Sequence, residues 1–339
     1  MMTTSERIGV LPTGDASGVL LSIIVPVYFN AATLEALYER IVAAFDATLE
    51  DRQLEIVFVD DGSGDNSYTV LTSLAERDRL RVRAIRLSRN FGSHAAILAG
   101  MHACRGRYAA VIGADLQEDP LIVRDMLAQA REAGVEVVLA CRKKREESAA
   151  KVGFANFYYW VMRTLSDAKF PPGGFDCYLV GRTVIDALIR MNESHTSLAA
   201  QILWTGFPAA YIHYTKEERK AGQSRWTIAK KVRLFTDSLI SFSRLPIKMV
   251  ELLGFTSAFI GLLYAALIIF MALFGELPPE TRGWASTMVV LLVVSGIILV
   301  SIGIMGEYLW RILDTARQRP VFLVADSLNV DRNDNSTRN

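Results

Sequence analysis

The chain of 339 residues is 51% hydrophobic and 22% charged, with a formal net charge of +1 at pH 7. This hydrophobic share is high for a water-soluble enzyme, and the near-neutral charge gives no reason to expect a nucleic-acid partner. The 3 cysteines are far apart and have no CxxC spacing, which argues against a cysteine zinc site and a disulfide framework. Reduced cysteines suit a protein that faces the cytosol.

The first part of the chain predicts an α/β domain. Residues 1–19 are polar and have no apolar core segment, so we expect a flexible tail and not a signal peptide. Short apolar runs then alternate with segments of helical spacing. Predicted strands are 20–27, 54–59, 82–87, 108–112 and 135–140, and predicted helices are 34–49, 70–77, 94–104 and 121–133. Apolar strands separated by helices predict a Rossmann-like, mostly parallel sheet covered on both faces.

Three predicted strands end in polar clusters, at the edge where such a sheet binds ligands. The clusters are Pro26-Val-Tyr-Phe-Asn30, Asp60-Asp-Gly-Ser63 and Asp115-Leu-Gln117. The third precedes Pro120, which suits the first turn of a helix, so an ordinary helix cap explains it equally well by itself. Three such clusters on one edge favour a ligand site over solvated loops.

Two uncharged segments, 252–274 and 284–306, are each long enough to cross a hydrocarbon core of about 30 Å as a helix. The preceding residues 226–250 mix cations with apolar side chains, as amphipathic helices in a membrane surface do. Cations flank the outer ends of both spans, whereas the connection 275–283 has only Arg282. This positive-inside bias predicts a multi-pass inner (plasma) membrane protein with both termini and the α/β domain in the cytoplasm.

The expected organisation therefore has six parts: a tail at 1–19, the α/β domain at 20–226, juxtamembrane amphipathic helices at 227–250, transmembrane helices at 251–275 and 284–310, and a cytosolic tail at 311–339. This layout suggests one soluble substrate and one in the lipid bilayer. Acidic strand ends suit a nucleoside diphosphate held through Mg2+ or Mn2+, because these cations prefer oxygen ligands. Arg219 and Arg225 would hold an anionic lipid head group, since guanidinium forks bind phosphate oxygens in two places.

Five motifs occur in a recognisable order: Ser22-Ile-Ile-Val-Pro-Val-Tyr28, Val59-Asp-Asp-Gly-Ser63, Leu87-Ser-Arg-Asn-Phe-Gly92, Ala114-Asp-Leu-Gln117 and Arg219-Lys-Ala-Gly-Gln-Ser-Arg225. Together they resemble the inverting GT-A glycosyltransferases of the dolichol-phosphate mannose synthase type. In addition, Gly303-Ile-Met-Gly-Glu-Tyr-Leu-Trp-Arg311 resembles the C-terminal span of the bacterial branch, the undecaprenyl-phosphate glycosyltransferases with two membrane helices. The resemblance covers about residues 20–325.

The resemblance implies a GT-A domain that moves one sugar, with inversion, from a UDP- or GDP-sugar to a polyprenyl phosphate. The product is a lipid-linked sugar for cell-envelope glycan or protein glycosylation. The resemblance also implies Mg2+ or Mn2+ as cofactor, and a homo-oligomer whose stoichiometry the sequence does not fix. The implied nucleotide-sugar contacts are Pro26, Tyr28, Asn30, Val59, Asp61, Ala114, Asp115, Gln117 and Arg142.

The remaining implied roles concern the metal, the acceptor and catalysis. Asp115 and Gln117 bind the metal, and Arg219, Ser224 and Arg225 bind the acceptor or the diphosphate; the catalytic residues are Asp176 and Asp115. The nucleophile is a phosphate oxygen that is already anionic near neutral pH, so no strong base is required. Asp176 would accept a residual proton or orient the acceptor, or else it merely closes the turn that precedes it.

The sequence departs from the family pattern at three positions. Asn30 stands where the family usually has Glu, and Arg225 stands where it has Lys. Gly113 stands in place of the first Asp of the Asp-Ala-Asp-Leu-Gln motif, so one carboxylate of the metal site is absent. We expect weaker metal affinity, with Asp61, Glu118 or water assisting Asp115 and Gln117.

Two rival functions remain. A processive polysaccharide synthase is suggested by Gln223-Ser-Arg-Trp226, but the Gln-x-x-Arg-Trp signature of that group is one residue longer, and two spans are few for a polymer channel. A degenerate transferase that serves as a membrane scaffold or nucleotide-sugar sensor is suggested by Gly113 and Asn30.

Overall fold

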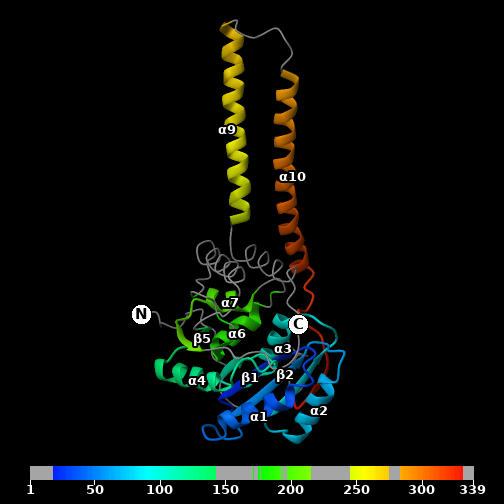
Figure 1. The fold of residues 1–339 in the computed structure, drawn as a ribbon, viewed down its shortest axis with the longest axis vertical. Helices are drawn as coiled ribbons and strands as arrows, with labels where there is room; N and C mark the ends of the chain where they lie inside the picture. Colours follow the sequence, from blue (N-terminus) through cyan, green and yellow to red (C-terminus); the bar gives the residue numbers. More distant parts are fainter. Residues whose placement is uncertain are drawn as a thin grey trace, which may run out of the picture. The chain divides into compact units, whose positions relative to one another are not determined.

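The computed structural model describes residues 18–142, 171, 175, 177–191, 193, 197–214, 245–274 and 283–330. The chain divides into two compact units. The first combines Met1–Phe235 with Pro320–Asn339, and the second is Thr236–Arg319. Figure 1 shows their helices and strands, with labels where there is room.

The first unit is built on an eight-stranded sheet of order β7-β5-β6-β4-β1-β2-β3-β8. β1 is parallel to β2 and β4, β2 to β3, and β5 to β7, whereas β6 and β8 run antiparallel to their neighbours. The predicted α/β domain with a mostly parallel sheet is thus confirmed. The strands are β1 (Leu21–Val27), β2 (Leu54–Asp60), β3 (Val82–Leu87), β4 (Tyr108–Val111), β5 (Val137–Arg142), β6 (Cys177–Gly181), β7 (Ala209–Tyr214) and β8 (Val324–Leu328).

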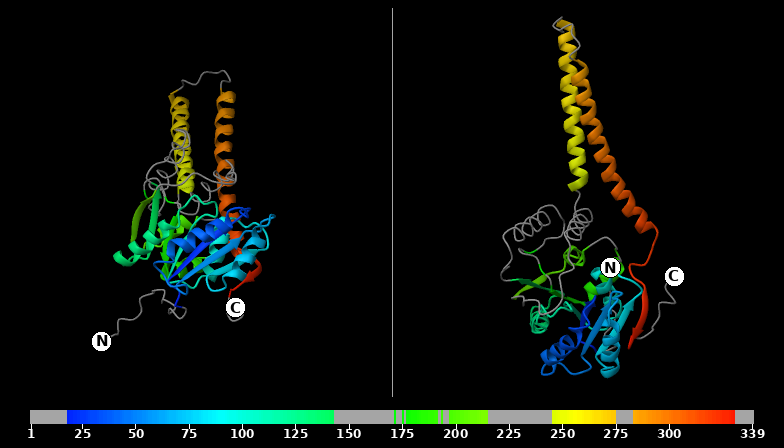
Figure 2. Two further views of the ribbon diagram at one scale, coloured as in Figure 1. Left: turned by 60° about the horizontal axis from the view of Figure 1, so that its bottom comes forward. Right: turned by 45° about the vertical axis from the view of Figure 1, so that its right-hand side comes forward.

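Helices cover both faces of this sheet (Figures 1 and 2). They are α1 (Leu34–Phe45), α2 (Ser67–Arg77), α3 (Ser93–Ala103), α4 (Leu121–Ala133), α6 (Arg182–Met191) and α7 (Leu198–Trp204). Successive side chains of a strand point to opposite faces. Accordingly, Ile23 and Val25 join the core under α1, α2 and α4, whereas Ile24 faces α3. A Cβ on Gly100 of α3 would lie 2.5 Å from Cγ2 of Ile24, so glycine allows α3 to approach the sheet closely.

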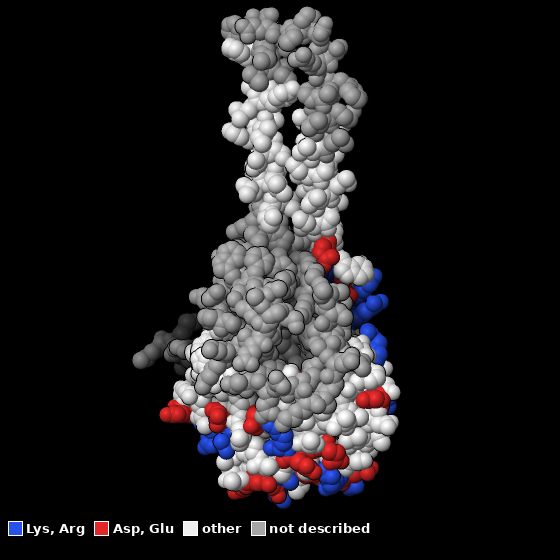
Figure 3. All heavy atoms as spheres, in the orientation of Figure 1, with Lys and Arg blue, Asp and Glu red and all other residues white. Residues whose placement is uncertain are grey.

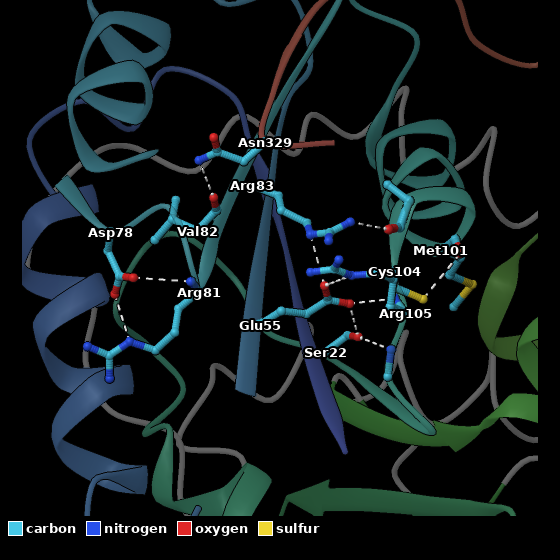
Figure 4. Close-up of polar contacts among 12 residues, drawn as sticks. Ser22, Glu55, Asp78, Arg81, Val82, Arg83, Met101, Cys104, Arg105 and Asn329 are labelled. Atoms are coloured by element: carbon cyan, nitrogen blue, oxygen red, sulfur yellow. Dashed lines mark hydrogen bonds and ion pairs between the residues drawn. The ribbon is translucent and has the colours of Figure 1, made fainter. Parts of the chain in front are cut away.

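A buried polar cluster lies at the amino ends of β1 and β2 (Figure 4). The Glu55 carboxylate is fully buried and accepts hydrogen bonds from the Ser22 hydroxyl and the Arg105 N–H. It also lies 2.9 Å from Nε of Arg83, whose side chain is only 4% exposed. A carboxylate is tolerated in such surroundings only when it is paired and hydrogen-bonded. This cluster therefore fixes the start of both central strands.

The last strand, β8, comes from the segment that the sequence pattern assigns to a tail. It pairs with the edge strand β3, and the Asn329 amide donates to the carbonyl oxygens of Ala75 and Val82 at 2.7 and 2.9 Å. The Ser88 N–H donates to the Leu323 oxygen at 2.9 Å. The short apolar run Val321-Phe-Leu-Val324 is the local indication of this strand. Its pairing covers an otherwise open edge of the sheet.

The second unit contains two helices, α9 (Leu245–Phe274) and α10 (Gly283–Ala316), which include the two predicted spans. Among the described residues, one stretch, Val293–Ala316, is long and apolar enough to cross a membrane, with a mean hydropathy of 1.8 and none of its apolar window buried. The apolar stretch of α9, Leu252–Tyr264, is shorter. Figure 3 shows long uncharged surfaces on both helices and intermixed acidic and basic side chains on the first unit. The membrane span expected at 251–275 thus remains a prediction.

We predict that Glu55→Ala strongly destabilises the protein, by about 3–5 kcal/mol, because it leaves a buried guanidinium without its carboxylate. The matched control is Glu35→Ala, which breaks the exposed Arg77–Glu35 pair and should cost less than about 1 kcal/mol. Chemical denaturation of both variants in detergent micelles measures the difference. Equal stability of the two variants would show that the buried cluster is not needed.

Candidate nucleotide-sugar site

The three polar clusters predicted from the sequence meet at one edge of the sheet. In the parallel register Val27 lies beside Asp60, and Ile24 lies beside Val111, so the loops after β1, β2 and β4 emerge together. Hydrogen bonds join these loops directly. The Thr33 hydroxyl donates to the Ala114 oxygen at 2.6 Å, and the Phe29 N–H donates to the Ser63 hydroxyl at 3.0 Å.

Asp61 ties the end of β2 to the loop that follows β3. Its side chain is buried, and its two carboxylate oxygens accept the N–H groups of Phe91 at 2.7 Å and Gly92 at 2.9 Å. Burial raises the pKa of Asp61, and the two N–H donors offset only part of that shift. Gly62 allows the close approach, because its φ is +66° and a Cβ there would lie 2.5 Å from the Arg89 carbonyl carbon.

Neighbouring residues of β2 support this edge from within the sheet. Asp60 is fully buried, accepts the Ser63 N–H at 3.2 Å and lies 3.7 Å from Nε of Arg86. Desolvation raises the pKa of Asp60 as well. Val59 is also fully buried and faces Gly100 of α3. Its side chain therefore packs in the core, and its implied contact with a nucleotide stays a prediction.

The loop after β1 presents aromatic and amide groups at the site. Pro26, Tyr28 and Asn30 are all partly exposed. The side-chain oxygen of Asn30 accepts the Tyr28 N–H at 3.0 Å, and the backbone N–H of Asn30 donates to the Ser67 hydroxyl at 3.0 Å. The exposed Phe29 has a φ of +57° and packs edge-to-face against Tyr28 with ring centroids 4.7 Å apart. Left-handed backbone at a bulky residue is a strained conformation that gathers at functional sites.

The loop after β4 forms a second strained turn, in which Leu116 has a φ of +60° and is buried. Asp115 and Gln117 flank it and are both partly exposed, and the Gln117 N–H lies 3.4 Å from Oδ1 of Asp115. Ala114 is buried. Glu118, also buried, accepts the Gly113 N–H at 3.2 Å. The strained turn thus places two oxygen-bearing side chains, one on either side of a buried leucine.

This donor set fits a cation that shares its ligands with a diphosphate. Among the described residues no group of three or more His, Cys, Asp or Glu side chains could hold a metal ion alone. Mg2+ commonly takes one or two protein carboxylates and completes its shell with phosphate oxygens and water. Asp115 and Gln117 meet that requirement, and Gly113 allows the carboxylates of Glu118 and Asp115 to lie close to its backbone, where a Cβ would be 2.8 Å from Oε2 of Glu118.

The other predicted site residues are described in part or not at all. Arg142 ends β5, which runs in the same direction as β4 because β6 is antiparallel to both strands. Its backbone therefore reaches the same edge of the sheet. Asp176, Arg219, Ser224 and Arg225 lie outside the described residues, so their roles stay predictions.

Several residues that build this site were not assigned a role from the sequence. Thr33 links two loops, and the backbone of Phe91 and Gly92 holds Asp61. The motif Leu87-Ser-Arg-Asn-Phe-Gly92 indicates that the loop after β3 belongs to the site, because it is part of the family pattern although it has no assigned chemical role. Its position after β3 explains that pattern structurally.

Comparison with known proteins agrees with this architecture. Residues 22–183 match glycosyl transferase family 2. An uncharacterized glycosyltransferase of Bacillus subtilis, YkcC, is 34% identical over 91% of this chain and 94% of its own length. An undecaprenyl-phosphate 4-deoxy-4-formamido-L-arabinose transferase of Pseudomonas savastanoi is 31% identical over 90% and 89%, and a bactoprenol glucosyl transferase of Shigella phage SfX is 31% identical over 90% and 98%.

An α/β sheet with polar loops gathered at its carboxyl edge defines a class of proteins that bind ligands at that edge. Within that class, the chain belongs to glycosyl transferase family 2, as the 34% identity over nearly the full length of both proteins shows. It is a glycosyltransferase, and the resemblance seen in its sequence motifs is confirmed at the level of the family.

We predict that Asp61 titrates above the ordinary value of 3.8, because burial raises its pKa. As the pH falls, Asp61 then protonates earlier than an exposed aspartate, and the Gly92 amide loses its anionic acceptor. In protein labelled with 15N-glycine, the Gly92 amide resonance should move with a midpoint above 3.8, whereas the Gly134 amide, which donates to the Ala130 carbonyl oxygen, should not follow it. A Gly92 midpoint at or below 3.8 would contradict the raised pKa.

Proposed function

We propose that this enzyme transfers one sugar, with inversion, from a nucleotide-sugar to a polyprenyl phosphate at the inner membrane. The observation that carries the proposal is the convergence of the loops after β1, β2 and β4, joined by hydrogen bonds, at one edge of the sheet. The names of two relatives refer to undecaprenyl phosphate and bactoprenol, which supports a polyprenyl phosphate as the acceptor.

The donor would lie across the three loops. The partly exposed Pro26, Tyr28 and Asn30 would border the base. Asp61 holds the loop after β3 and would thereby position the part of the site that binds the ribose. Asp115 and Gln117 would contact the diphosphate. When bound, Mg2+ or Mn2+ would neutralise the charge that develops on the departing diphosphate.

The acceptor phosphate needs orientation more than activation. Its second pKa lies near 6, so it is largely anionic at neutral pH. An oxygen of this phosphate attacks the anomeric carbon from the face opposite the diphosphate, which inverts the configuration. We assign Arg219, Ser224 and Arg225 to binding the acceptor phosphate, and Asp176 to positioning it. Asp115 would contact the diphosphate, which is the leaving group.

The chain path supports two membrane crossings. β8 follows α10, yet it pairs with β3, which precedes α9. Strands in one sheet lie on one side of the membrane, so the chain between them crosses an even number of times. If Val293–Ala316 crosses, α9 is the partner span that the described part of the chain offers. The ends of the chain would then lie on the same side of the membrane, and the cations that flank the spans predict that this side is the cytoplasm.

This topology predicts where new cysteines can be labelled. The native cysteines at 104, 141 and 177 are buried and should give little background. In intact cells, a membrane-impermeant maleimide should label Thr281→Cys, between the helices, and should label Asn333→Cys only after permeabilisation. Protection of Thr281→Cys in intact cells would contradict two crossings.

Asp176→Asn should lower kcat by roughly 10²-fold, the size of a positioned acid-base or orienting group, and leave donor affinity nearly unchanged. Transfer kinetics and nucleotide-sugar binding, measured separately, check this prediction. An equal loss in both quantities would point to a structural role.

The proposed function itself is tested with membranes that contain the enzyme, a panel of UDP- and GDP-sugars and an added polyprenyl phosphate, with the product analysed by mass. We expect one sugar per lipid, and no product from Asp115→Asn. A polymer would indicate a processive synthase, and no transfer from any donor would indicate a scaffold or sensor.

A further inference from the structure

Glu118 is a buried carboxylate at the site to which the proposed mechanism gives no role. It lies three residues before Leu121, the first residue of α4, and is only 5% exposed, and its Oε2 accepts the Gly113 N–H at 3.2 Å. Burying a carboxylate is costly unless donors or charges stabilise it, and the Gly113 N–H is one such donor.

The position of this carboxylate is specific with respect to Gly113. A Cβ built on Gly113 would lie 2.8 Å from Oε2 of Glu118 and 3.2 Å from Oδ1 of Asp115. Both carboxylate oxygens therefore border the same space, which glycine leaves open. Any side chain at residue 113 would displace Glu118 from it.

We propose that Glu118 is the second carboxylate ligand of the divalent cation, and that Gly113 is required because it makes room for it. Asp115, Gln117 and Glu118 would together present their oxygens to a cation carried by the donor diphosphate. Oxygen ligands of this kind suit Mg2+ and Mn2+. This inference rests on the proposed function and assigns a cation ligand at the same site.

Mn2+ binding in the presence of saturating UDP, followed by electron paramagnetic resonance without acceptor or turnover, tests the inference. Glu118→Gln keeps an oxygen that can accept the Gly113 N–H but removes the charge. We expect this variant to lose about 10- to 100-fold in Mn2+ affinity, the range seen when groups that support a metal are removed. Asp119→Asn, at a neighbouring carboxylate that is 46% exposed, should bind Mn2+ as the native protein does.

A second test moves the carboxylate from residue 118 to residue 113, so that a regained Mn2+ affinity cannot be explained by a folding defect. Gly113→Asp alone should bind Mn2+ poorly, because its side chain competes with Glu118 for one space. Combined with Glu118→Ala, which vacates that space, Gly113→Asp should restore most of the affinity. Thermal unfolding confirms that each variant is folded.

Native Mn2+ affinity in folded Glu118→Gln would overturn the inference. A double variant no better than Glu118→Ala would overturn the claim that the two positions share one space. If the native protein binds UDP and Mn2+ tightly while Glu118→Gln is unaffected, only this inference fails. If the native protein binds no nucleotide at all, the proposed function fails with it.

Discussion

The candidate site depends on one buried carboxylate. Asp61 uses both oxygens to hold the N–H groups of Phe91 and Gly92, and so binds the end of β2 to the loop after β3. Without this contact the loops at the edge would have to be held by weaker links, such as Thr33 to Ala114. The raised pKa of Asp61 is the electrostatic cost of placing a charge where it can organise two loops.

The remainder of the domain keeps that edge rigid. The Glu55 cluster fixes the amino ends of the central strands, and the apolar faces of β1 and β2 pack on helices from both sides. The site is therefore built at one end of strands that are anchored at the other. Such a scaffold can hold the strained turns at Phe29 and Leu116, because the surrounding packing and hydrogen bonds keep the backbone in these conformations.

Local sequence patterns predicted the strands β1 to β5 and the three polar strand ends, because apolar runs and turn residues lie within short segments. They did not predict β6, β7 or β8. The pairing of β8 with β3 joins residues more than 200 positions apart, and no local periodicity carries that information. Local patterns also do not predict that the Glu118 carboxylate lies close to Gly113, because the turn at Leu116 brings these two residues together.

The central claim is that the edge formed by β1, β2 and β4 binds the donor nucleotide. Photoreactive UDP- and GDP-sugar analogues, followed by mass mapping of the labelled peptides, measure this directly in the full-length protein. The account predicts labelling within residues 26–30 or 61–67, suppressed by excess unmodified donor. Donor-protected labelling confined to the opposite edge of the sheet, around Glu55 and Arg105, would contradict it.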